Sequence, residues 1–85
     1  MPYYKHIKTG NIYRIKDFVL VEHPDTHNWV QGIVYSTVYA KSKNDPSKYV
    51  EIIPESLRNR SFVRTQERFM ERFEPIEEKD IKLEK

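Results

Sequence analysis

The sequence contains no cysteine and only two glycines. Without cysteine the chain forms no disulfide and offers no thiolate ligand to a metal, which suits a reducing compartment. The two isolated glycines, Gly10 and Gly32, provide neither a glycine-rich phosphate loop nor the strained turn of a nucleophilic serine. We therefore predict no enzymatic activity, no catalytic residue and no cofactor.

Long apolar runs are also missing. The longest uncharged apolar stretch, residues 33–40, is interrupted by Ser36 and Thr37, and the first residues lack the apolar segment of a signal peptide. We therefore expect no membrane contact and a cytoplasmic location. The chain is rich in Ile, Lys, Asn, Tyr and Phe, residues with AT-rich codons, which favours a bacterial cell or a phage-infected host.

The 85 residues are enough for one domain, and the formal net charge is +2 at pH 7. Residues 1–73 hold twelve Lys and Arg against eight Asp and Glu, which gives +4. Residues 74–85 hold three against five, which gives −2. We expect a single, moderately basic β-barrel domain over residues 1–75 and a charged tail over residues 76–85.

Three histidines, His6, His23 and His27, are the candidate ligands for zinc. A site would need all three together with a nearby carboxylate. The spacing of His23 and His27 brings two ligands to one side only on a helix, and Pro24 disfavours a helix there. We therefore predict loop histidines and no metal.

Residues that favour β-structure predict a mainly β fold. Polar turns at residues 23–28 and 41–48 divide the chain. The run at 18–21 is apolar throughout, which predicts a strand covered on both faces or crossing between sheets. A bend is expected near Gly32, where a bulge or tight curvature meets least steric resistance. Strands are expected over residues 12–16, 18–21, 29–40 and 49–53.

One short helix is expected near the C-terminus. Thr65 is a suitable N-cap, and Phe69, Met70 and Phe73 then lie on one apolar face. A helix this short is unstable alone in water, so that face must pack on a sheet formed by residues 11–53. These elements predict a small, partly open Src-homology-3-like β-barrel with one short C-terminal helix. An oligonucleotide-binding-type barrel and a simple curved sheet packed on the helix are the neighbouring alternatives.

Three stretches carry a family pattern, and the middle one is His23 followed by Thr26 and then Val34-Tyr35, with about two residues inserted between His23 and Tyr35. Residues 4–15 follow Tyr-x-His-Tyr-Lys-Gly-x-x-Tyr-x-Val with one residue added before the last Tyr. Residues 63–71 follow Val-Arg-Pro-x-x-Met-Phe-x-Glu, with Thr and Arg in place of the family's Pro and Met. The chain thereby resembles domain-of-unknown-function family 1653, a bacterial family. The resemblance implies a small, soluble, β-rich fold of unknown activity. It assigns no role to the pattern residues, which are Tyr4, His6, Tyr13 and His23.

Basic and aromatic residues together form the strongest candidate binding surface. Lys and Arg cluster in the 41–48 loop, before residue 61 and at the junction of strand and helix, and tyrosines lie in the flanking strands. Aromatic rings edged by cations are what stacked single-stranded bases require. Surface pairing of Arg with Glu, and tyrosines that build the core, are the structural alternative. The candidate binding residues are Lys41, Lys43, Lys48, Arg58, Arg60, Arg64, Tyr35 and Trp29.

Trp29 and Arg64 each allow a structural and a functional role. Trp29 either packs half-buried at the start of its strand or lines a groove for a peptide. Arg64 either pairs with Glu22 or Glu51 as a structural bridge, or holds an anion. The sequence leaves both alternatives open and favours the structural one in each case.

We expect a non-catalytic binding module, a small bacterial or phage accessory protein that binds or inhibits a protein partner. The partner would be held on the basic and aromatic face or on an exposed strand edge. The alternatives are a nucleic-acid-binding barrel that uses the same face, and a pocket for a small anionic ligand. A monomer and a homodimer paired through a strand edge are both open.

Overall fold

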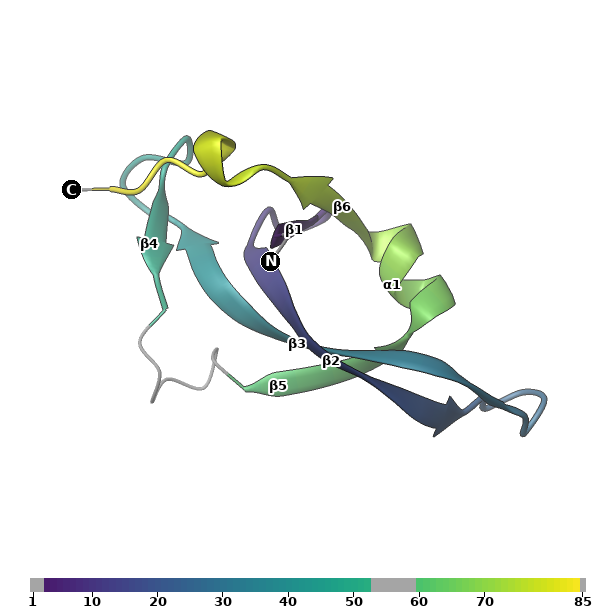
Figure 1. Ribbon diagram of the computed structural model, residues 1–85. Coiled ribbons are helices and arrows are strands. Elements are labelled where there is room, and N and C mark those ends of the chain that lie inside the picture. Colours follow the sequence, from purple (N-terminus) through teal and green to yellow (C-terminus); the bar gives the residue numbers. More distant parts are fainter. Residues whose placement is uncertain (1–2, 53–59, 85) are drawn as a thin grey trace.

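The computed structural model describes residues 3–52 and 60–84. Arg58, one of the candidate binding residues, lies outside the described residues. None of the helices within them is long and apolar enough to cross a membrane. The elements in chain order (Figure 1) are β1 (Tyr3–His6), β2 (Ile12–Glu22), β3 (Trp29–Lys41), β4 (Tyr49–Glu51), β5 (Ser61–Thr65), α1 (Gln66–Arg72), β6 (Phe73–Ile76) and a 3-10 turn, η2 (Glu78–Asp80).

The strands form one open antiparallel sheet in the order β4-β3-β2-β1-β6. The strand β5 also pairs with β3, over residues 32–36, whereas β4 pairs with residues 39–41 further along β3. No closed barrel is seen in the part of the chain that the structure describes. The expected mainly β fold with one short helix near the C-terminus is therefore confirmed, while the expected barrel is observed only as an open sheet.

The longest strands, β2 and β3, form a two-stranded ribbon. Segments 12–16 and 18–21, expected as two strands, belong to the single strand β2, whose register shifts between Ile15 and Asp17. Neither shift in this ladder lies at Gly32, which pairs in register with Val19, so the bend expected near Gly32 involves no bulge at that residue. A Cβ at Gly32 would lie 3.0 Å from the Cγ1 of Val21, so glycine permits close packing at this position.

The ribbon continues beyond its neighbours as an arm, which comprises residues 18–31. Figure 1 shows β2 and β3 running past β5 and α1 to their turn, and the molecule measures 46 × 25 × 21 Å. Phe18 and Leu20 are 55% and 69% exposed. The prediction that residues 18–21 are covered on both faces or cross between sheets is wrong, because two of these side chains are exposed and the stretch stays paired with β3 in one sheet.

The helix α1 begins as expected. The hydroxyl of Thr65 accepts a hydrogen bond from the N–H of Arg68 at 3.3 Å, which satisfies one of the free donors of the first turn. Phe69 is fully buried and Phe73, the first residue of β6, is also buried. Met70, however, is 50% exposed. Its predicted burial is wrong, because one residue along a helix is a rotation of about 100°.

Aromatic rings make up most of the core. Phe69 and Phe73 stack with centroids 4.3 Å apart, and Tyr35 of β3 meets them at 5.2 and 5.1 Å. Tyr4 of β1 contacts Phe69 edge-on at 5.2 Å, and Ile33 completes the cluster. The helix thus packs on β3, as predicted, and also on β1, which lies outside the segment expected to cover it.

The chain after Pro75 is not a detached tail. In β6, Ile76 pairs with Tyr3 of β1. Beyond η2, the N–H of Tyr49 donates to the carbonyl of Lys82 and the N–H of Glu84 donates to the carbonyl of Tyr49, both at 2.8 Å. In Figure 1 this last segment, in yellow, runs back to β4. The acidic composition of residues 76–84 therefore does not prevent backbone pairing with the sheet.

Candidate functional site

Arg64 is held against the aromatic core. The antiparallel register of β3 and β5 places Arg64 opposite Ile33 and Phe62 opposite Tyr35. The Nε of Arg64 donates to the Tyr35 hydroxyl at 2.6 Å, and its Cζ lies 6.0 Å from the centroid of Phe73. Burial raises the pKa of Tyr35, and the Arg64 hydrogen bond opposes that rise. The predicted partners Glu22 and Glu51 are wrong, since the partner is a tyrosine.

Phe62 and Tyr13 border a pocket of about 310 Å³. Phe62 lies 5.7 Å from Tyr35 and 6.5 Å from Tyr13, measured between ring centroids, yet it stays 39% exposed. Among the described residues, no acidic side chain lines this pocket. We call it the Phe62 pocket, and it is lined by Asn11, Tyr13, Thr37, Ala40, Lys41, Lys43 and Phe62.

The predicted basic residues do not all converge. Lys41 and Lys43 line the Phe62 pocket, whereas Lys48 and Arg60 are exposed and do not contribute to its lining. The ion pairs of the described residues join Lys5 to Glu74, Lys79 to Glu77 and, where the histidine is protonated, His27 to Glu22. The candidate cations within residues 3–52 and 60–84 therefore form no ion pair with a carboxylate of those segments.

The four residues of the family pattern have structural contacts. His6 packs edge-on against Phe73 at 4.9 Å, and Tyr13 meets the same ring at 5.1 Å. Tyr4 contacts the core as described above. His23 lies in the turn of the arm, where its Nδ1 accepts a hydrogen bond from the N–H of Asp25 at 3.1 Å. Three of the four thus support the aromatic core, and the fourth shapes a turn.

His6 has a pKa below 6.5 because it is partly buried and because Arg64, Arg72 and Lys8 lie near it. Its Nδ1 also accepts a hydrogen bond from the N–H of Thr9 at 3.2 Å, which protonation of that nitrogen would break. We predict that Arg72→Gln raises the His6 pKa, measured by NMR titration of the ring protons. Neutral His6 contributes to the free energy of unfolding. This contribution is complete above pH 6.5 and is lost as the pH falls through the lower pKa of the folded state. An unchanged pKa in the variant would contradict this assignment of cause.

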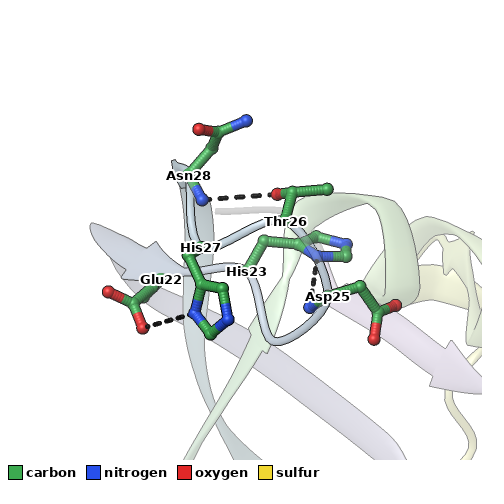
Figure 2. A network of polar contacts seen from close by, with 6 residues as sticks. All are labelled: Glu22, His23, Asp25, Thr26, His27 and Asn28. Atoms are coloured by element: carbon green, nitrogen blue, oxygen red, sulfur yellow. Dashed lines mark hydrogen bonds and ion pairs between the residues drawn. The ribbon is translucent and has the colours of Figure 1, made fainter.

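The turn of the arm is shown in Figure 2. The N–H of His27 donates to the carbonyl of His23 at 2.8 Å, and His27 has a φ of +59°, a conformation uncommon for residues other than glycine. Its Nδ1 lies 3.4 Å from the Oε1 of Glu22 (Figure 2). Within residues 3–52 and 60–84, no group of three or more histidine or carboxylate side chains is placed to hold a metal.

The arm presents an apolar face that the sequence did not reveal. Trp29 is 67% exposed, so its predicted half-buried position is wrong. The register places Trp29 opposite Glu22, Leu20 opposite Gln31 and Phe18 opposite Ile33. Residues two positions apart on a strand share a face, and so do residues directly opposite each other. Phe18, Leu20 and Glu22 therefore share one face of the ribbon, and Trp29, opposite Glu22, projects from the same side. The difference in strand length could have indicated this exposed arm, since β2 and β3 are much longer than β1, β4 and β5 and extend beyond them.

Comparison of the chain with protein-family models, with curated proteins and with solved structures finds no match. The resemblance to domain-of-unknown-function family 1653 therefore stays a prediction.

Proposed function

We propose that the protein is a non-catalytic binding module that adds an extended segment of a protein partner to the free edge of β2 along the arm. The observation that carries the proposal is the exposed apolar face of the arm beside that edge. A Src-homology-3-like arrangement and an accessory role in a bacterial cell or a phage-infected host belong to the same proposal and rest on the sequence.

The edge of β2 is open beyond β1. Among the described residues β2 pairs only with β1 and β3, and β1 covers residues 12–14. The N–H of His23 donates to the carbonyl of Asn28 across the ribbon at 2.7 Å. Because backbone groups alternate in direction along an antiparallel strand, those of Leu20 and Glu22 point away from β3. They are therefore available to pair with an added strand.

One outward donor is already occupied. The N–H of Phe18 donates to the Oδ1 of its neighbour Asp17 at 2.8 Å. A carboxylate at an edge strand limits uncontrolled pairing with other chains. The pairing segment is therefore short and centred on Leu20, and the exposed side chains of Phe18, Leu20 and Trp29 supply apolar contact on one face. Backbone pairing for affinity and side-chain contact for specificity are the general features of strand addition.

Leu20→Pro tests the edge directly. Proline is tolerated in an edge strand where the N–H points outward, so the ladder with β3 survives while one donor is removed and the edge is blocked. Peptides selected on the wild type from a displayed library of random ten-residue sequences should bind Leu20→Pro about tenfold more weakly or worse, measured by calorimetry. Leu20→Val keeps the N–H and should retain most of the affinity, and Lys43→Gln should bind as the wild type does.

Two outcomes would contradict the proposal. Selected peptides that bind Leu20→Pro as tightly as the wild type would show that the edge is not used. A concentration-dependent homodimer in sedimentation that Leu20→Pro abolishes would make a second copy of the chain the occupant, in place of a partner. Circular dichroism of Leu20→Pro confirms that the variant is folded before either result is read.

A further inference from the structure

We propose that the Phe62 pocket binds a nucleobase whose attached phosphate is held by Lys43. The base would come from a free nucleotide or from a single-stranded nucleic acid, which share this chemistry. The site is separate from the arm and does not depend on the function proposed above. Its volume of about 310 Å³ lies at the lower end of the range of small-molecule sites, about 300–1,000 Å³, which suits one base with its phosphate.

An aromatic surface is available in the pocket. Phe62 packs with Tyr35 at an interplanar angle of 33°, and Tyr13 meets it edge-on at 73°. These contacts fix the ring from two sides and still leave 39% of the residue exposed. Every base has a π-face, so a fixed, partly exposed ring is a stacking platform that tolerates different sequences.

Polar groups that can read a base edge lie beside the ring. Thr37 is only 4% exposed, and its hydroxyl has no hydrogen-bond partner within residues 3–52 and 60–84. A buried hydroxyl without a partner costs free energy until a ligand or a water supplies one. The side-chain oxygen of Asn11 accepts from the backbone N–H of Lys41 at 3.3 Å, which fixes the amide and leaves its NH₂ group to donate.

The charge around the pocket favours an anion. Within the described part of the chain, Lys41 and Lys43 contribute to its lining and no carboxylate does. On the other side of Tyr13, at 6.3 Å between ring centroids, lies His6, whose pKa is lowered by burial and by Arg64, Arg72 and Lys8. Arg64, Arg72 and Lys8 therefore add positive charge near the aromatic cluster. An acidic peptide would satisfy the lysines, but it would leave the ring of Phe62 and the Thr37 hydroxyl unused.

The test uses two kinds of probe on the full chain, at 20 and 150 mM salt. Adenosine and uridine 5′-monophosphates are titrated by NMR, and labelled oligonucleotides of two, four and eight deoxythymidines are titrated by fluorescence anisotropy. We expect saturable binding at 20 mM salt with shifts at Asn11, Tyr13 and Phe62. If affinity is the same for mononucleotide and oligonucleotide, the ligand is a free nucleotide. If it rises with length, the ligand is a single strand.

Matched variants separate stacking from general charge. Phe62→Leu stays apolar but loses the ring, and it should weaken binding about tenfold. Lys43→Gln should weaken it several-fold and lower the salt dependence, the slope of log K against log[salt], by about 0.7, as expected for one lost phosphate contact. Lys48→Gln removes the same charge outside the pocket lining and should have little effect on mononucleotide binding.

The proposal is overturned if no probe binds saturably at 20 mM salt. It is also overturned if Phe62→Leu, shown by circular dichroism to be folded, binds as tightly as the wild type, or if Lys48→Gln weakens mononucleotide binding as much as Lys43→Gln does. In the last two cases the attraction is a diffuse surface charge and not a site.

Discussion

Phe69→Ala is expected to lower the free energy of unfolding by about 3–5 kcal/mol, the usual cost of truncating a buried phenylalanine. Phe69 has no exposed surface and lies at the centre of the aromatic core. Its ring stacks on Phe73 and meets Tyr4 and Tyr35 edge-on, so the truncation removes three aromatic contacts and leaves a cavity between the helix and the sheet. A domain of this size has a total stability of the same order, so much of the variant would be unfolded.

Urea denaturation followed by circular dichroism measures this change. Met70→Ala is the matched control, because Met70 is the next residue of the same helix and half of it is exposed. The control should lose no more than about 1 kcal/mol. Phe69→Leu, which retains part of the apolar volume, should fall between the two. Equal losses for Phe69→Ala and Met70→Ala would mean that the helix does not dock through Phe69.

The features that sequence predicted well depend on local chemistry. Thr65 is an N-cap because a β-region hydroxyl can accept from the N–H three residues later, and this requires only neighbouring residues. The turns at residues 23–28 and 41–48 follow from Pro, Asp and Asn, whose own geometry favours turns. The mainly β character and the single helix follow from these signals and from the alternation of apolar residues.

Burial in the arm could not be predicted because it depends on distant elements. Trp29 and Leu20 are apolar residues in a strand, and the sequence alone favours a packed position for both. They are exposed because β1 and β5 pair with other parts of β2 and β3. The shift between Ile15 and Asp17 adds to this difficulty, since a single inserted residue exchanges the faces of all residues that follow.

The candidate site was predictable in composition and not in geometry. Lys41, Lys43 and an aromatic face were identified as elements of a binding surface, and the structure brings the two lysines together with Tyr13 and Phe62. The contact of Arg64 with Tyr35 depends on the β3–β5 register, which spans 29 residues of sequence. Charge pattern alone gave carboxylate partners for Arg64, because it carries no information on register.

Removal of residues 77–85 is expected to lower the free energy of unfolding by about 2–4 kcal/mol. The loss comes from hydrogen bonds worth about 0.5–1.5 kcal/mol each and from exposure of the buried ring of Tyr49. The segment makes two backbone hydrogen bonds to Tyr49, and Leu83 forms a parallel bridge to the same residue. Glu84 accepts a hydrogen bond from the buried hydroxyl of Ser42. Without these contacts, the pairing of β4 within the described residues consists of its three pairs with β3.

Hydrogen exchange locates the effect. The amide of Tyr49, which donates to Lys82, should lose protection in the truncated chain far more than the amides of the β2–β3 ladder, because an edge strand of three residues opens without the rest of the sheet. Lys79→Ala is the control, since it breaks only the exposed Lys79–Glu77 ion pair and should change stability by at most about 1 kcal/mol. If the truncated chain is as stable as this control and Tyr49 keeps its protection, residues 77–85 are an independent tail. If the stability of the truncated chain and the protection of the Tyr49 amide both fall, the acidic C-terminal segment is part of the folded sheet. Its negative charge then partly offsets the positive charge of residues 1–73 within one domain.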